Sequence, residues 1–258
     1  MSKLRPALNS LFIAFSTYSR IPMPQAEWSD DNRRYALCFF PAIGLVIGAL
    51  ALLWLRLCDA LSLNALLRGA GGCAISVLVS GGIHLDGFCD TTDAIASYGS
   101  PEMRLDILRD PHVGAFAVIR CGLYYLLLAG ALGELHADGA GWVAALGFVL
   151  SRALSGLGVV TLNGARKEGL LQSFADAAQA QTVRTALFAV IALCALCMVI
   201  AAPLPGLLAV AGAVATFFYY RRMSLKHFGG ITGDLAGWFL CVCEAVIALL
   251  AAIGGRLL

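Results

Sequence analysis

The chain has 258 residues, of which 60% are hydrophobic and only 13% are charged. A soluble domain carries roughly a quarter charged residues, so this composition excludes an ordinary soluble domain and predicts an all-α, polytopic integral membrane protein. The 28 glycines are typical of helices that pack closely in lipid. The net charge of +2 indicates no particular partner. Because the chain has neither a basic stripe nor zinc-finger spacing, we expect no nucleic-acid partner.

Residues 1–20 predict an amphipathic helix that lies on the membrane surface or packs on the helical bundle. No small-residue cleavage site follows it, so this segment does not resemble a signal peptide. Pro22 and Pro24 end the helical pattern. The apolar positions that recur at helical spacing are Leu4, Leu8, Leu11, Phe12 and Phe15.

Apolar runs of the length that crosses a bilayer, about 20 residues, predict about seven transmembrane helices in one domain of residues 1–258. A loop after the sixth span carries Lys226, His227 and the run 229–234. The expected spans cover residues 36–57, 65–83, 113–133, 142–162, 183–202, the run from about Pro205 to Tyr219, and 235–253.

The distribution of basic residues orients this bundle. With the N-terminus inside and seven alternating spans, one side receives thirteen lysines and arginines and the other receives only Arg56, Arg68 and Arg256. This bias predicts a multi-pass membrane protein whose basic side faces the cytoplasm. It also places the aspartate-rich run 80–93, the loop 163–182 and the loop 229–234 together on the cytoplasmic side.

The run 80–93 carries Asp86, Asp90 and Asp93, spaced so that all three carboxylates share one face of a helix. Clustered carboxylates repel one another unless a cation lies between them. Mg²⁺ prefers such hard oxygen ligands and binds through one or two carboxylates plus substrate phosphates. The stripe therefore predicts a Mg²⁺ site, and the alternative is a helix cap or a solvated helix face.

A fourth carboxylate, Asp234, follows paired glycines in a distant loop. Carboxylates alone would indicate a cation path, but carboxylates among cations indicate a metal-bridged polyphosphate, because Mg²⁺ and basic side chains share the charge of a transferring phosphoryl group. The arginines and lysines expected near these carboxylates, on the cytoplasmic side of the bundle, are Arg104, Arg109, Arg152, Arg166, Lys167 and Lys226. The general excess of basic residues on the cytoplasmic side of membrane proteins explains the presence of Arg166 and Lys167 equally well.

Two further residues lie where polar groups are costly. Arg152 interrupts a predicted span, which predicts either a functional role or an ion pair with Glu244 in the last span. His84 precedes the first aspartate and is a candidate ligand, proton donor or interfacial residue.

The run 81–93 closely resembles the Gly-Gly-x-His-Leu-Asp-Gly-x-x-Asp-x-x-Asp signature of the cobalamin synthase family. Five further blocks resemble that family in the same order along the chain. They are Ser19–Pro24, Arg109-Asp110 with Gly114, Ser151-Arg152, Ala165–Leu170 and Gly229–Asp234.

The resemblance implies a Mg²⁺-dependent adenosylcobinamide-GDP ribazoletransferase, which joins α-ribazole or its 5′-phosphate to adenosylcobinamide-GDP with release of GMP. It implies Mg²⁺ ligands at Asp86, Asp90, Asp93 and Asp234. Candidate catalytic residues are His84, Arg109, Asp110 and Arg152. Candidate substrate-binding residues are Arg20, Arg104, Arg166, Lys167, Lys226 and Thr232. The other expected partner is the lipid bilayer, and the sequence leaves homo-oligomerisation open.

The chain departs from the family pattern at three places. Ala94 follows the last aspartate where the family usually has glycine, and Pro111-His112 stands where it often has Ser-Arg. Cys241 stands where relatives carry an additional acidic residue, about one turn before Glu244. These changes leave room for altered activity or substrate preference.

Two other classes also fit an aspartate-rich membrane site. Membrane transferases such as CDP-alcohol phosphotransferases and prenyltransferases bind diphosphates through aspartates and Mg²⁺, but His84 and the run 229–234 argue against both. A small-solute transporter would place its acids near the bilayer midplane, often within repeated halves. Here the acids lie at the end of a span, and the chain has no internal repeat.

Overall fold

A computed structural model describes residues 4–257, and within that range the chain forms twelve α-helices and no extended strand, as the composition predicts. The helices are α1 Leu4–Tyr18, α2 Asp30–Arg33, α3 Ala36–Ala60, α4 Ala65–Ser80, α5 Ile83–Ala96, α6 Pro101–Ile107, α7 Ala115–Gly133, α8 Gly139–Thr161, α9 Leu170–Ala177, α10 Ala180–Ala201, α11 Pro203–Phe228 and α12 Gly233–Arg256.

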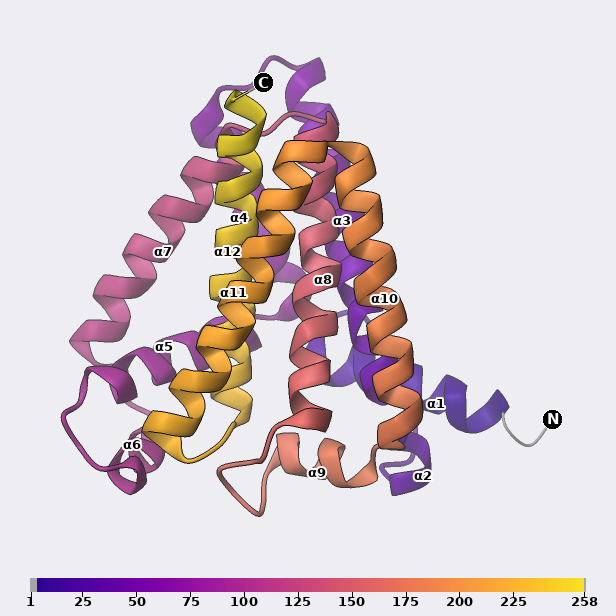
Figure 1. The fold of residues 1–258 in the computed structure, drawn as a ribbon, viewed down its shortest axis with the longest axis vertical. Coiled ribbons are helices and arrows are strands. Elements are labelled where there is room, and N and C mark those ends of the chain that lie inside the picture. The colour runs from indigo at the N-terminus through magenta and orange to yellow at the C-terminus, as the bar shows by residue number, and fades with distance from the viewer. Residues whose placement is uncertain (1–3, 258) are drawn as a thin grey trace.

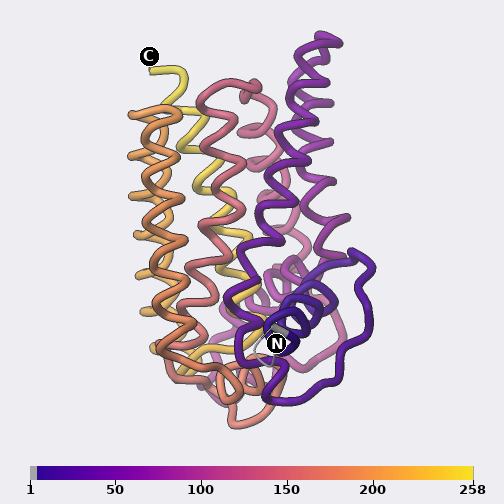
Figure 2. Tube along the Cα trace, turned by 90° about the vertical axis from the view of Figure 1, so that its right-hand side faces the viewer, coloured from indigo at the N-terminus to yellow at the C-terminus, as the bar shows by residue number. Residues whose placement is uncertain are grey.

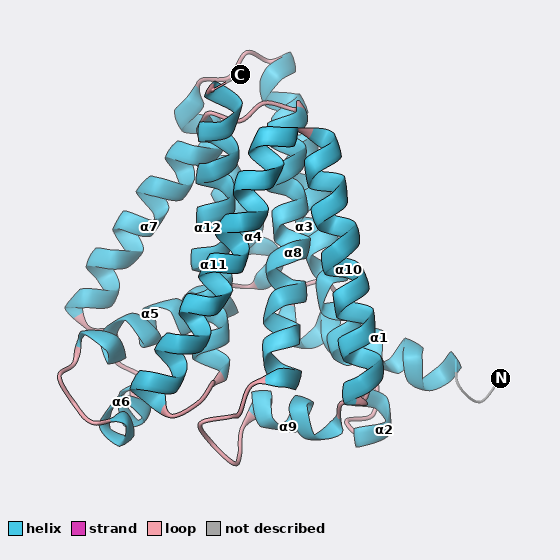
Figure 3. Cartoon of the chain, viewed as in Figure 1, coloured by secondary structure: helices cyan, strands magenta, loops and turns pink. Residues whose placement is uncertain are grey.

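The long helices run between two unlike ends of the molecule (Figure 1). One end, which we call the wide end, carries the shorter helices α1, α2, α5, α6 and α9 (Figure 3). The opposite end carries the turns between α3 and α4, α7 and α8, and α10 and α11, together with the C-terminal end of α12. The described ends of the chain therefore lie at opposite ends of the bundle (Figure 2).

Among residues 4–257, the helices that are long and apolar enough to cross a membrane are six, namely α3, α7, α8, α10, α11 and α12. A seventh crossing arises if α4 and α5 are counted as one broken span. The prediction of a second span over 65–83 is wrong in its boundary, because α4 ends at Ser80 and α5 begins at Ile83 with a bend of 99°. After the bend, α5 runs across the wide end and so lies outside the crossing helices (Figure 1).

Two consecutive glycines make this bend. Gly81 and Gly82 have φ angles of 68° and 83°, a left-handed conformation that other residues adopt only at a cost. The peptide N–H of Arg20 donates to the carbonyl of Val79 at 2.8 Å, which ties the segment after α1 to the end of α4. The glycine pair therefore turns the aspartate-bearing helix across the bundle.

Three boundaries differ from the sequence expectation. Helix α11 continues to Phe228, so Lys226 and His227 lie in its last turn and not in a loop. The expected loop 163–182 contains α9, and α2 was not expected. The N-terminal helix is confirmed from Leu4 to Tyr18, while Met1 to Lys3 lie outside the described residues.

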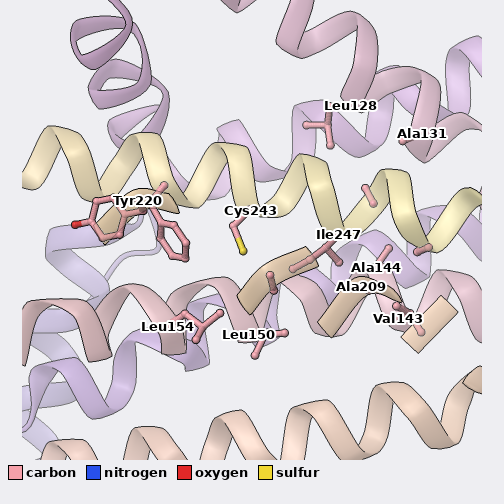
Figure 4. Close-up of a cluster of buried hydrophobic side chains, with 14 of the residues drawn as sticks. Leu128, Ala131, Val143, Ala144, Leu150, Leu154, Ala209, Tyr220, Cys243 and Ile247 are labelled. Carbon is pink, nitrogen blue, oxygen red and sulfur yellow. The ribbon is translucent and has the colours of Figure 1, made fainter. Parts of the chain in front are cut away.

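The core lies around α8, which is buried along most of its length. Figure 4 shows part of it, where Leu150 and Leu154 of α8 lie near Tyr220 of α11 and near Cys243 and Ile247 of α12. All nine cysteines are free. The core holds α12 between α8 and α5, and so supports the wide end.

Helices α5 and α12 cross with their backbones in direct contact. A Cβ atom placed on Gly87 would lie 2.7 Å from the carbonyl oxygen of Asp234, and one on Gly237 would lie 2.9 Å from the carbonyl oxygen of His84. Real Cβ atoms essentially never approach other atoms at under 3.0 Å. The two glycines therefore allow the aspartate-bearing helix to rest on the start of α12.

We expect Gly87→Ala to force α5 and α12 apart and to destabilise the protein by about 1–3 kcal/mol, the usual cost of overpacking. Gly130→Ala on α7 is the matched control, because an added Cβ there meets no atom within 4 Å. Thermal unfolding of the purified variants in detergent compares the two. A Gly87→Ala protein as stable as the Gly130→Ala control would contradict the close crossing.

Candidate active site

Three carboxylates come together where α5 crosses α12. Asp86 and Asp90 lie on α5, and Asp234 lies in the first turn of α12. The pKa of the Asp90 carboxyl is raised to about 6, first by burial and then by neighbouring negative charges. Those neighbours are Asp86, Asp234 and Asp93, in decreasing order of effect. The sequence predicted, from the order of the spans alone, that Asp234 lies near the aspartates of residues 80–93. The structure confirms this placement, since the charge of Asp234 acts on Asp90.

Asp93 has a separate structural task. Its two carboxylate oxygens accept hydrogen bonds from the backbone N–H groups of Gly114, at 2.6 Å, and of Ala117, at 2.8 Å. These N–H groups belong to the unpaired donors at the start of α7, and a carboxylate there also complements the helix dipole. The helix-cap alternative therefore holds for Asp93, and its role as a metal ligand stays a prediction.

Two loops that carry sequence motifs are joined by backbone hydrogen bonds. Ala165 N–H donates to the carbonyl of Ile231 at 2.8 Å, and Ile231 N–H donates to that of Asn163 at 2.9 Å. Gly230 allows this approach, since a Cβ there would lie 2.6 Å from the Ala165 nitrogen. The short parallel bridge carries Arg166 to the acidic cluster.

The electrostatics of Arg166 reflect that placement. Burial lowers the pKa of its guanidinium, and the positive charge of Arg109 lowers it further. The negative charges of Asp234 and Asp106 act in the opposite direction. Arg166 also donates from Nη2 to the carbonyl of Leu105 at 2.6 Å. Arg109 and Arg166, far apart in the sequence, thus form one positive region beside the carboxylates.

The other predicted cations lie around this region. Arg104 Nη1 lies 2.8 Å from Nδ1 of His227, and its Nη2 donates to the carbonyl of Ser97 at 3.2 Å, which ties α6 to α11 and to the end of α5. Lys167 and Lys226 are exposed. Arg20 is exposed and its side chain lies over Gly81.

A cavity of about 220 Å³ opens between these elements. Five of the predicted site residues line it: His84, Asp86, Arg166, Thr232 and Asp234. Thr232 caps α12, since its Oγ1 accepts from the N–H of Leu235 at 3.2 Å. The remaining predicted residues do not line it: Arg20, Asp90, Asp93, Arg104, Arg109, Asp110, Arg152, Lys167 and Lys226.

Sequence reasoning missed the apolar part of the cavity lining. It consists of apolar and aromatic side chains that include Tyr18 of α1, Phe40 of α3 and Val159 of α8. These residues belong to none of the charged motifs, and apolar residues in spans give no sign of facing a cavity. No signal in a single sequence separates them from the lipid-facing or core residues beside them.

Arg152 forms the predicted ion pair in the centre of the bundle. Its side chain has no solvent exposure, and Nη1 donates to Glu244 Oε1 at 2.7 Å and to the carbonyl of Phe148 at 2.9 Å. Ser151 Oγ donates to the same Glu244 oxygen at 3.1 Å. Within residues 4–257, Nε and Nη2 of Arg152 have no hydrogen-bond partner. The pair joins α8 to α12, and a catalytic role for Arg152 stays a prediction.

Asp110 and its neighbour His112 lie on the exposed segment before α7. The backbone N–H of His112 donates to Asp110 Oδ1 at 3.0 Å, and the ring Nδ1 lies 2.6 Å from the same oxygen. These interactions hold the pKa of the Asp110 carboxyl below its usual range, with the backbone bond as the main cause. The histidine that departs from the family pattern therefore pairs with Asp110.

The arrangement fits a metal shared with a substrate better than a closed metal cage. Among residues 4–257, no three side chains of the histidine, cysteine, aspartate and glutamate type are grouped as a ready-made metal site. Mg²⁺ commonly binds through one or two carboxylates, several waters and substrate phosphates. Asp86 and Asp234 on the cavity wall, with Asp90 beside them, are suited to that mode.

Residues 10–252 match the family described as Cobalamin-5-phosphate synthase. The chain belongs to this family. The match covers nearly the whole chain and includes every motif at the wide end, so the resemblance noted in the sequence is confirmed. No solved structure matches the chain.

Three curated relatives illustrate the range of similarity, and all three are named adenosylcobinamide-GDP ribazoletransferase. The protein of Lachnoclostridium phytofermentans is 44% identical over 246 residues, which cover 95% of this chain and 94% of the relative. That of Pseudomonas aeruginosa is 32% identical, over 95% and 99% of the two chains. That of Desulfitobacterium hafniense is 31% identical, over 95% and 96%.

We expect Glu244→Leu to destabilise the protein by about 3–5 kcal/mol, because it leaves Arg152 buried and unpaired. The exposed pair of Arg256 and Glu134 supplies the control: Glu134→Leu should cost no more than about 1 kcal/mol. The double variant Arg152→Met/Glu244→Leu should recover most of the loss. Thermal unfolding midpoints in detergent test this, and equal losses for Glu244→Leu and Glu134→Leu would refute it.

Proposed function

We propose that this chain joins α-ribazole, or its 5′-phosphate, to adenosylcobinamide-GDP with release of GMP, by Mg²⁺-assisted phosphoryl transfer. Family membership supports the reaction, which is the last assembly step of cobalamin biosynthesis. The observation that supports the chemistry is the cavity at the wide end. Its polar wall combines the carboxylates of Asp86 and Asp234 with the guanidinium of Arg166, the groups that a metal-bridged diphosphate requires.

Asp86, Asp90 and Asp234 would hold the metal, with Asp93 as a further ligand at the start of α7. When bound, Mg²⁺ neutralises the diphosphate and stabilises the charge that develops in the transition state. The pKa of Asp90 is raised first by burial and then by repulsion from the neighbouring carboxylates, and a divalent cation removes that repulsion. The paired carboxylates thus have a physical reason to lie together.

The cations of the wide end would bind the remaining negative charge of the substrates. Arg166 lines the cavity and Arg109 lies close to it, so these two would contact the diphosphate. The outer cations Arg20, Arg104, Lys167 and Lys226 would attract and orient the substrates. Thr232 presents its hydroxyl beside Asp234, with Oγ1 at 3.4 Å from Oδ2, and would bind a phosphate oxygen.

The reaction needs one proton acceptor. The 3′-hydroxyl oxygen of the ribazole forms a bond to the corrinoid-side phosphorus, the bond from that phosphorus to the oxygen of GMP breaks, and GMP leaves with the electron pair. The hydroxyl proton passes to His84 or to one of the carboxylates. His84 lines the cavity, and its buried Nε2 has no partner within residues 4–257. Arg152 would add positive charge from behind the cavity.

We expect the purified protein to release GMP from adenosylcobinamide-GDP when it receives ribazole, or its 5′-phosphate, and Mg²⁺. Asp90→Asn should lower turnover on the order of a hundredfold or more, because it removes a charge from the metal site. Glu102→Gln, at an exposed position of α6, is the charge-matched control and should remain active. Absence of turnover by the unaltered protein with either acceptor would refute the function, and an active Asp90→Asn would refute the metal role.

We also propose that the wide end faces the cytoplasm of a bacterial inner membrane. The excess of basic residues on that side supports this orientation, as does the supply of nucleotide substrates from the cytoplasm.

The orientation has a direct test in fusion proteins, since the described ends of the chain lie at opposite ends of the bundle. A green fluorescent protein should fluoresce when fused to the N-terminus and stay dark when fused to the C-terminus. Alkaline phosphatase should show the reverse, because it folds only outside the cytoplasm. Fluorescence from both fusions would overturn the odd number of crossings, and the reverse pattern would overturn the orientation.

A further inference from the structure

The cavity at the wide end has two chemically different walls. Its polar wall carries Asp86, Asp234 and Arg166. The part of the lining that we call the apolar wall consists of Tyr18 of α1, Phe40 of α3 and Val159 of α8, and α5 and α12 add the apolar side chains of Ile83 and Leu240. Phe40 is 4% exposed and Val159 is 9% exposed, and both border the cavity. A ligand that fills the cavity must therefore be charged at one side and apolar at the other.

Aromatic rings shape the apolar wall. The rings of Tyr18 and Phe40 have centroids 4.7 Å apart, and that of Phe40 lies 5.9 Å from the ring of His84. Such clustered rings favour a flat aromatic ligand, which packs by stacked or edge-to-face contact. Two polar residues interrupt the wall, namely His84, whose Nε2 lacks a partner within residues 4–257, and the buried Ser155.

The size of the cavity limits the candidates. Pockets that enclose a drug-sized ligand measure about 300–1,000 Å³, and this one measures about 220 Å³. It is too small for a corrin macrocycle but has room for a bicyclic base. The bases of the two substrates are the guanine of adenosylcobinamide-GDP and the dimethylbenzimidazole of ribazole.

The chemistry of the wall separates these two bases. Guanine carries hydrogen-bonding groups on nearly every edge, and each group buried without a partner costs about 1–3 kcal/mol. Dimethylbenzimidazole has a methyl-bearing apolar edge and, in the nucleoside, a single free ring nitrogen. Its apolar edge suits Phe40 and Val159, and one donor, the hydroxyl of Ser155, suffices for the nitrogen.

We propose that this apolar wall binds the base of the ribazole acceptor and that Val159 limits the size of the base. The inference rests on the proposed function and deepens it. With the base against Phe40 and Val159, the attached ribose lies toward the polar wall. Asp86 and Asp234 of that wall would hold the metal that binds the diphosphate. Base recognition and phosphoryl transfer then take place at different parts of the lining of one cavity.

Steady-state kinetics with both substrates test the proposal on the full-length protein in detergent. Val159→Phe should raise KM for α-ribazole 5′-phosphate about tenfold or more, the scale on which hydrophobic pockets discriminate by size, and should leave KM for adenosylcobinamide-GDP within about twofold. The same variant should lose less with the acceptor that carries benzimidazole without its methyl groups. Val149→Phe, a partly exposed position on the same helix, is the matched control and should change neither KM.

Val159→Ala gives a second measurement if the larger side chain prevents folding. It should raise KM for the ribazole substrate and narrow the preference for the methylated base over bulkier ones. An effect of either variant on KM for adenosylcobinamide-GDP that equals or exceeds the effect on the acceptor would place guanine in the cavity and overturn the proposal. Failure of the proposed function is distinct, because the unaltered protein would then release no GMP with either acceptor.

Discussion

The backbone contact between α5 and α12 is the constraint on which the site depends. Gly87 rests on the backbone of Asp234, and Gly237 rests on that of His84, so no side chain separates the two helices. Only this spacing brings the α5 carboxylates and Asp234 close enough for their charges to act on one another. The two glycines therefore allow the helices to pack closely, and this close packing brings the aspartate charges together.

Deeper in the bundle than this crossing, the buried pair of Arg152 and Glu244 joins α12 to the central helix α8. Burying two charges costs more than their attraction returns unless further hydrogen bonds satisfy them, and here Nε and Nη2 of Arg152 lack partners within residues 4–257. Cys241 lies about one turn before Glu244 on α12, where the resemblance implies an additional acidic residue. A thiol is only a weak acceptor, so Cys241 adds no second carboxylate to the buried pair.

The sequence predicted the features that depend on charge and hydropathy: the membrane bundle, the gathering of three motifs at one end, and the pairing of Arg152 with Glu244. It did not predict the 99° bend, because the residues on both sides of Gly81 and Gly82 read as helix and a pattern gives no direction for a turn. It also left open that Asp93 caps α7, since the partner N–H groups lie on the backbone, where residue type gives no signal. The apolar wall of the cavity was invisible for a related reason: hydropathy cannot distinguish a residue that faces a cavity from one that faces lipid.

The elements that line the cavity differ in how tightly they are held. The polar wall comes from α5, the start of α12 and the bridged loop that carries Arg166, and each of these is held by backbone contacts that tolerate little change. The apolar wall comes from α1, α3 and α8, where Tyr18 also packs on Phe174 of α9 at 5.5 Å between ring centroids. Side-chain exchanges on this wall alter the shape of the cavity without moving the carboxylates. The N-terminal helix, which the sequence suggested only as a surface or packing element, is thus a wall of the site itself.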